Sequence, residues 1–336
     1  MSDIDSQLDV IVQQLMQKAA GLDSRVNRNE LRFGVEYLAF YGYLSEQSPE
    51  KGLAHVELAI GDFQNFFGLP ITNELDPLTT RAMFTPRCGV PDISPLRLQL
   101  PVGGLPTLQE TKWRKTSLKY FVESYVNGLT PGVQDSIFET AFSQWMNVAN
   151  IQISRTLAAS AADIIISTGQ GRRSQFDGPG NTLAWAYLPP GNDSQLLMRF
   201  DLDENWVDQA TGSGREILML NVATHEFGHL LGLEHSRVNN ALMAPYYAPQ
   251  ISKPQLNDDI PRIQEHYGPA IVVPAPPPPL PPAPVPPLPP APPLPPLPPV
   301  PGTPTPTPLP PNGKLTIEIF GSMTGFSIPG HTITKK

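Results

Sequence analysis

The sequence predicts an α+β domain that is preceded by a small all-α bundle. Residues 29–86 carry apolar side chains at the spacing of amphipathic helices, whereas from residue 113 onward short alternating segments come first and helices follow as a block. A third observation limits the folded part of the chain. Of the 42 prolines, 24 lie between residues 274 and 311, and such a stretch cannot form a globular core.

The bundle should contain three short helices. Two of them, over about 29–44 and 53–67, follow from the apolar spacing. The third should begin at Asp76-Pro77, because aspartate is a good N-cap and proline suits the first helical position. Three such helices are enough for a small packed unit.

The α+β domain should open with strands. Apolar and polar residues alternate over 118–122, as in a half-buried strand, and shorter strands should follow near 151–154 and 164–167. The stretch over 169–193 is rich in turn residues and is expected to form loops.

Helices should complete this domain. Thr130-Pro131 begins the first, and apolar residues predict a second over about 217–232. A last helix should start after an Asn257-Asp258 cap and end at Tyr267-Gly268.

The proline-rich stretch over 274–311 should be an extended polyproline helix, roughly 120 Å long if straight, and therefore a spacer or stalk. The 25 residues that follow are too few for a core of their own, and no role is assigned to them.

Composition excludes several classes of protein. The net charge of −8 and the lack of a basic stripe exclude nucleic acid as a partner. One cysteine excludes an intramolecular disulfide, and the absence of a run of about 20 apolar residues predicts no transmembrane segment. The first 20 residues do not have the pattern of a secretory signal.

Three of the six histidines lie within eleven residues. His225 and His229 are four apart, so a helix places both on one face, where their nitrogens can bind one metal ion. Gly232 then lets the chain turn back so that His235 supplies a third ligand. Three ligands of this kind predict a zinc site with one open position.

The open position predicts hydrolytic chemistry. Zinc lowers the pKa of a bound water toward about 7, and Glu226, beside the first histidine, can take the proton of that water as it attacks a carbonyl. Solvated histidines on an ordinary helix, or a non-catalytic metal site, are the alternatives. The length of the motif disfavours the first and Glu226 disfavours the second.

Two further motifs accompany the histidines. The sequence ALMAPYY over 241–247 follows them, and PRCGVPD over 86–92 precedes the second domain. With these motifs the chain, from about residue 31 to residue 268, resembles the matrix metalloproteinases, a metzincin family. The resemblance implies a zinc-protease domain with a twisted mixed sheet and three helices, behind a propeptide bundle of the peptidoglycan-binding-like type.

By this resemblance the chain divides into six segments. They are an N-terminal extension (1–28), a propeptide with a cysteine switch (29–92), an activation connector (93–112), a catalytic domain (113–270), a proline-rich linker (271–311) and a C-terminal tail (312–336).

The resemblance also implies site residues. Cys88 is the inhibitory zinc ligand that the propeptide delivers, and Arg87 pairs with Asp92 to hold the switch in shape. Met243 forms an apolar floor beneath the metal. The substrate pocket is implied to be built from Met243, Pro245, Tyr247 and Asn221. Asn221 is an unusual residue at the pocket floor and predicts an atypical side-chain preference.

A structural calcium is implied as well, because hard oxygen donors suit that ion. Its ligands would be the carboxylates and carbonyls of Asp177, Gly178, Gly180, Thr182, Asp201 and Glu204. An Asp-Gly-Pro-Gly turn is also common without any ion.

The chain departs from the family pattern at the second, structural zinc. The matching positions hold Arg172 or Arg173, Ser174, Trp185 and Arg199. We therefore expect that site to be absent, with Trp185 packing in its place. Leu197, in place of an aspartate, puts a further calcium site at Asp163 in doubt.

These observations predict a zinc endopeptidase made as a latent zymogen, with protein or peptide substrates and an activating protease as partners. The alternative is a cell-wall or glycan-binding module on a proline-rich stalk that recruits polyproline-binding partners, with a weak or inactive protease domain. The resemblance implies secretion, so either the natural N-terminus lies upstream or export is unconventional.

Overall fold

The computed structural model describes residues 3–20, 28–44, 52–93, 112–212 and 214–271. The predicted proline-rich linker and C-terminal tail lie outside these residues, as does most of the predicted connector. No helix in the described ranges combines the length and the apolar character that crossing a membrane requires.

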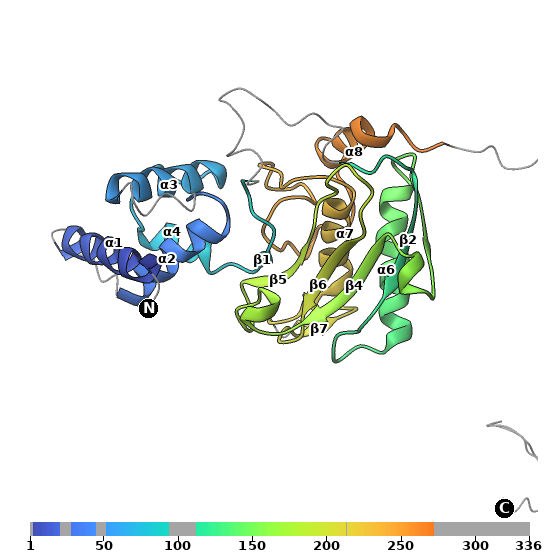
Figure 1. Ribbon diagram of the computed structural model, residues 1–336, viewed down its shortest axis with the longest axis horizontal. Coiled ribbons are helices and arrows are strands. Elements are labelled where there is room, and N and C mark those ends of the chain that lie inside the picture. Colours follow the sequence, from blue (N-terminus) through green and yellow to red (C-terminus); the bar gives the residue numbers. More distant parts are fainter. Residues whose placement is uncertain (1–2, 21–27, 45–51, 94–111, 213, 272–336) are drawn as a thin grey trace, which may run out of the picture. The chain divides into compact units, whose positions relative to one another are not determined.

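The N-terminal part is a bundle of helices (Figure 1). These are α1 (Asp3–Ala20), α2 (Arg28–Phe40), α3 (Leu53–Phe66) and α4 (Pro77–Met83). The expected cap of α4 is present, because the Asp76 side chain accepts a hydrogen bond from the Thr79 amide at 2.8 Å. Buried Gln64 holds the loop before α4 by donating to the Thr72 and Thr79 hydroxyls, each at 2.8 Å.

Helix α1 corrects the expectation that residues 1–28 are an extension outside the bundle. Ile11, Val12 and Leu15 are buried in the same core as α2 and α3. On the surface, Lys18 pairs with Glu57 at 2.8 Å. These three apolar residues lie at helical spacing, so a sequence signal existed, although it is short and interrupted by polar residues.

The second part is built on a mixed sheet of six strands in the order β1-β5-β6-β4-β2-β3. The strands are β1 (Arg87–Cys88), β2 (Ser117–Val122), β3 (Gln152–Arg155), β4 (Ile164–Gly169), β5 (Thr182–Ala186) and β6 (Leu196–Asp201). All neighbours pair in parallel except β5 and β6. Two short strands, β7 (Trp206–Val207) and β8 (Ile217–Leu218), form a separate parallel pair.

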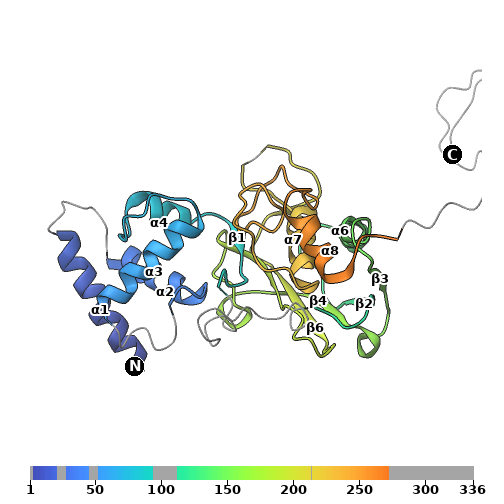
Figure 2. The ribbon, with the colours of Figure 1, turned by 90° about the horizontal axis from the view of Figure 1, so that it is seen from above.

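The mixed sheet and its three helices confirm the predicted fold class. The helices are α6 (Pro131–Met146), α7 (Met219–Leu230) and α8 (Asp259–Tyr267), and the two short 3-10 turns are η3 (Ala159–Ala161) and η4 (Arg172–Ser174). Helices α6 and α7 pack side by side on one face of the sheet (Figure 2). The rings of Phe142 of α6 and Phe227 of α7 stack with their centres 3.6 Å apart. This contact fixes which face of α7 packs against α6 and which face is directed away from it.

Strand β5 lies in the stretch that was expected to be loops. All five of its residues are buried, so it lacks the polar alternation that reveals half-buried strands. The short strand β1 was not expected either. It pairs with β5 through residues of the PRCGVPD sequence over 86–92, called the switch motif below. This pairing places the switch motif at the edge of the sheet.

Asp258 is the N-cap residue of α8, within the predicted Asn257-Asp258 pair, but its side chain does not cap the helix. It pairs with Arg262 at 3.2 Å instead. Buried Asp259 accepts hydrogen bonds from the amides of Gln255, Leu242 and Met243 at 2.7 to 3.0 Å. The adjacent carboxylate thus connects the start of α8 to the segment beneath the histidines.

Candidate metal centre and active site

Helix α7 presents two histidines on one buried face. His225 and His229 lie one turn apart, and their Nε2 atoms are 3.1 Å from each other. The helix ends at Leu230, and Gly232 takes φ 100°, which lets the chain reverse. His235 then returns with its ring centre 4.8 Å from that of His229.

The three imidazoles all turn Nε2 toward one another. Nδ1 of His225 donates to the Leu242 carbonyl at 2.7 Å, and Nδ1 of His229 donates to the Leu233 carbonyl at 2.6 Å. A carbonyl oxygen only accepts, so the proton of each ring is on Nδ1 and the Nε2 lone pair is free. Burial lowers the pKa of all three histidines, that of His225 to about 3, so the rings stay neutral.

Cys88 completes the cluster. Its Sγ lies 3.4 Å from Nε2 of His229. The four ligand atoms of Cys88, His225, His229 and His235 lie within 4.8 Å of one another, and all four residues are buried. Burial and the nearby Glu226 carboxylate raise the pKa of the thiol, and a cation bound at the cluster would lower it.

These atoms fit a zinc ion. Nε2 of His235 is buried without a hydrogen-bond partner, and the other two Nε2 atoms face each other as lone pairs. Nitrogen and sulfur donors that converge in this way are the ligands that zinc prefers in tetrahedral sites.

Glu226 lies beside this cluster. Both of its carboxylate oxygens are buried without a hydrogen-bond partner. Burial raises the pKa of this carboxyl to about 8, the range in which a general base or acid works at neutral pH.

Strand β1 places Cys88 in a cleft between two backbone segments. On one side the Gly89 amide donates to the Ala184 carbonyl of β5 at 2.8 Å. On the other side the Cys88 amide donates to the Pro245 carbonyl, and the Tyr247 amide donates to the Pro86 carbonyl, each at 2.9 Å. The switch motif is therefore held on both sides as an added strand.

The expected Arg87–Asp92 pair is confirmed. Nη2 of Arg87 lies 2.5 Å from Oδ1 of Asp92, and both side chains are fully buried. Burial alone would raise the pKa of Asp92, but Arg87 and His235 lower it to about 2. The guanidinium also lies 3.5 Å from the ring centre of Tyr41 and donates to the Tyr37 hydroxyl at 2.6 Å. Tyr37 of α2 and Tyr41, which directly follows that helix, had not been predicted to contact the switch motif.

Comparison with known proteins decides the family. The family model that describes matrixin matches residues 112–268. Rat matrilysin is 36% identical over 232 residues, which cover 67% of this chain and 81% of that protein. The chain belongs to the matrixin family. The matched domain is accordingly that of a zinc metalloendopeptidase.

Other relatives of this matrixin are longer. Rat stromelysin-1 is 37% identical over 241 residues, 68% of this chain and 47% of that protein. Bovine interstitial collagenase is 38% identical over 213 residues, 62% of this chain and 42% of that protein. The alignments with these two relatives thus cover less than half of their length.

A pocket adjoins His225 and Glu226 in this matrixin. Asn221, Pro245 and Tyr247 line it, whereas Met243, the fourth residue expected in the substrate pocket, is not among its lining residues. The Asn221 amide donates to the carbonyls of Ala248, Pro249 and Ile251 at 2.9 to 3.2 Å, so it fixes the outer wall of the pocket.

Met243 is fully buried and lies against α7. A Cβ atom at Gly228 would overlap the Met243 sulfur and would come within 2.8 Å of Trp145. Glycine is therefore required at this position of the histidine helix, a requirement that the sequence alone did not reveal.

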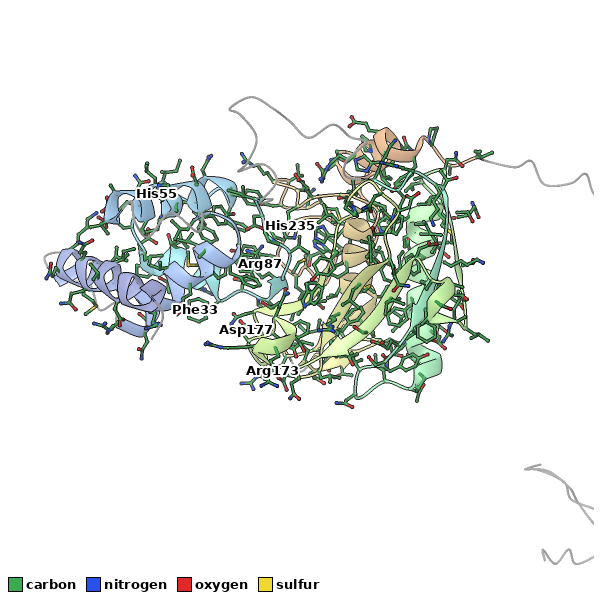
Figure 3. The ribbon with its side chains drawn as sticks, viewed as in Figure 1. Phe33, His55, Arg87, Arg173, Asp177 and His235 are labelled. Atoms are coloured by element: carbon green, nitrogen blue, oxygen red, sulfur yellow. The ribbon has the colours of Figure 1, made fainter. Side chains whose placement is uncertain are left out.

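The expected calcium ligands surround the turn over 177–182 (Figure 3 labels Asp177). Glu204 accepts a hydrogen bond from the Gly180 amide at 2.6 Å, and Asp177 accepts one from the Thr182 amide at 3.2 Å. One oxygen of Asp201 is buried without a partner. Burial and neighbouring carboxylates raise the pKa of Asp201 to about 6 and that of Glu204 to about 7.

The positions that depart from the family pattern make other contacts. Trp185 is buried, packs on Phe176 and donates to the Ser174 carbonyl at 2.9 Å, while the Arg199 guanidinium lies 5.7 Å from its ring centre. Trp185 thus braces the loop as predicted. Asp163 pairs with Lys115 at 2.7 Å and so has a cation of its own.

Proposed function

We propose that this matrixin is a zinc endopeptidase made as a latent zymogen, in which Cys88 fills the fourth metal position. One observation carries the proposal: a thiol from one motif and three Nε2 atoms from another converge within 4.8 Å in a buried cluster. A thiolate is a strong zinc ligand and leaves no room for water.

His225, His229 and His235 would hold the zinc after the switch leaves. When bound, zinc lowers the pKa of a water molecule and polarises the carbonyl of the substrate. Glu226 would take a proton from the attacking water and would later give it to the leaving amine.

The substrate would be an extended segment of a protein or peptide. Strand β1 is held by the Ala184 and Pro245 carbonyls, and a substrate strand can use the same backbone groups once β1 has left. The substrate side chain next to the cut bond would enter the pocket whose outer wall Asn221 fixes. We therefore expect that wall to set which substrate side chains are preferred.

Calcium is the second proposed ion. The unpartnered Asp201 oxygen and the raised pKa values of Asp201 and Glu204 support it. Bound calcium would remove the repulsion among these carboxylates and stiffen the turn beside β5. An extracellular place of action and an activating protease are further parts of the proposal, and they rest on family membership.

Metal content and peptide cleavage test the proposal together. Glu226→Ala should keep one zinc per chain and lose cleavage of a fluorogenic peptide by about 10²- to 10⁴-fold after activation. Cys88→Ala should raise the activity of the full-length chain by roughly tenfold or more, because the thiolate no longer competes with water for the zinc. Each tenfold rise corresponds to about 1.4 kcal/mol of lost thiolate binding free energy. Glu265→Ala, on the exposed side of α8, is the control.

The proposal is wrong if Glu226→Ala cleaves as fast as the parent chain. It is also wrong if the processed protein, purified without chelator, holds no zinc.

A further inference from the structure

The three histidines of the metal cluster are oriented by partners of different origin. The Nδ1 partners of His225 and His229 are the Leu242 and Leu233 carbonyls of the catalytic domain. Nδ1 of His235 instead donates to Oδ1 of Asp92 at 2.8 Å, and Asp92 belongs to the switch motif. One of the three Nδ1 hydrogen bonds that orient the histidines thus comes from the propeptide.

Asp92 is built into this position. Its side chain and that of His235 are both fully buried. Oδ1 receives both Arg87 and His235, while Oδ2 receives Arg87 at 3.1 Å and the Tyr43 hydroxyl at 2.9 Å. The carboxylate is therefore saturated, and its orientation is fixed from three sides (Figure 3 labels Arg87 and His235).

His235 needs such a partner more than the other two histidines do. His225 and His229 are fixed by α7, whereas His235 follows Gly232 in a segment without regular structure. Its Nε2 atom, which faces the cluster, makes no hydrogen bond that could hold the ring.

We propose that Asp92 is a positioning residue of the metal centre, because it orients His235. The latent chain then holds zinc more tightly than the processed enzyme, and the Asp92–His235 hydrogen bond adds to the contribution that Cys88 makes as a ligand. This inference rests on the proposed zinc function. A carboxylate that accepts the Nδ1 proton fixes the ring and raises the basicity of Nε2, and loss of such a partner lowers metal affinity by about 10- to 100-fold.

The test uses the full-length chain and two matched variants. Asp92→Asn keeps the shape but removes the charge that His235 faces, whereas Tyr43→Phe removes a different partner of the same carboxylate. Zinc affinity is measured by competition with a chelator. Cobalt-substituted samples report the thiolate–metal absorption band, which shows whether Cys88 is still a ligand.

Asp92→Asn should lower zinc affinity by about 10- to 100-fold, keep the thiolate–cobalt band and shift the ligand-field bands. Tyr43→Phe should change affinity by less than about threefold, because Oδ1 keeps its bond to His235. The inference is overturned if Asp92→Asn binds zinc like the parent chain. It is equally overturned if the thiolate band disappears, since Asp92 would then act only through Cys88.

His235→Ala separates this inference from the proposed function. If His235→Ala loses zinc while Asp92→Asn does not, the positioning role fails and the zinc site stands. If His235→Ala binds zinc as tightly as the parent chain, the zinc site itself is wrong.

Discussion

At the scale of single residues, burial sets the protonation states on which the site depends. The three histidines are neutral because charged rings would lose hydration, and the fixed Nδ1 protons leave three lone pairs for one cation. Sequence spacing predicts that His225 and His229 share a face. It does not predict the Nδ1 partner of His235, because Asp92 lies 143 residues away in another motif.

The carboxylates near the 177–182 turn give a pH-dependent prediction. In the folded chain the pKa of Asp201 is about 6 and that of Glu204 about 7, above their ordinary values of 3.8 and 4.5. The folded state thus binds more protons than the unfolded state between about pH 4 and 7, so stability falls as the pH rises through this window. Saturating calcium should abolish the fall, because the cation compensates the ionised groups.

Thermal unfolding at several pH values, in calcium and in chelator, measures this effect. Asp201→Asn is the control, since it removes one ionising group and should flatten the curve in chelator. Equal slopes with and without calcium would contradict a calcium site here.

At the scale of helices and strands, helix-capping residues and apolar spacing predicted more of the secondary structure than composition did. The capped starts of α4 and α6 lie at the predicted residues, because Asp76 and Thr130 accept the expected backbone hydrogen bonds. Strand β5 was missed since it is buried on both faces and does not alternate. Strand β1 was missed because it has only two residues, and these form a strand only by pairing with β5 at the edge of the sheet.

The contact of α7 with the segment beneath it depends on a glycine. Gly228→Ala should lower the free energy of unfolding by about 1 to 3 kcal/mol, because the added methyl group would overlap Met243 and press on Trp145. Denaturant titration of the zinc-loaded chain measures the loss.

The matched control is Gly132→Ala in the first turn of α6, where a Cβ atom would meet nothing within 4 Å. That substitution should stabilise the chain by about 0.4 to 1 kcal/mol. A Gly228→Ala variant that is as stable as the parent chain would show that Met243 can move away without cost.

At the scale of the whole described structure, the bundle and the sheet domain both contact the segment that carries Cys88. Beyond the switch itself, Phe67 stacks on Tyr246 with ring centres 4.5 Å apart, and the Tyr41 hydroxyl lies 3.2 Å from that of Thr182. The motifs predicted the metal ligands, but not these contacts, which depend on the tertiary arrangement of loops. The family resemblance likewise did not identify Asp259 as the residue that anchors the segment with Met243.

The aromatic contact should contribute to latency independently of the thiol. Phe67→Ala removes a pair worth about 0.5 to 1.5 kcal/mol, so basal cleavage by the full-length chain should rise about 2- to 10-fold. The reaction of Cys88 with a thiol reagent should accelerate by the same factor. Leu58→Ala, at an exposed position of α3, should change neither rate.

The ion pair of Arg87 and Asp92 has a consequence for activation. Splitting a buried pair by removing one partner typically costs about 3 to 5 kcal/mol, because a bare charge stays behind in a dry environment. Here Arg87 of β1 and Asp92 are only five residues apart in one segment, so in the proposed activation they would leave together. Release of this segment would therefore carry both charges of the ion pair into water together, and neither partner would be left buried alone in the catalytic domain.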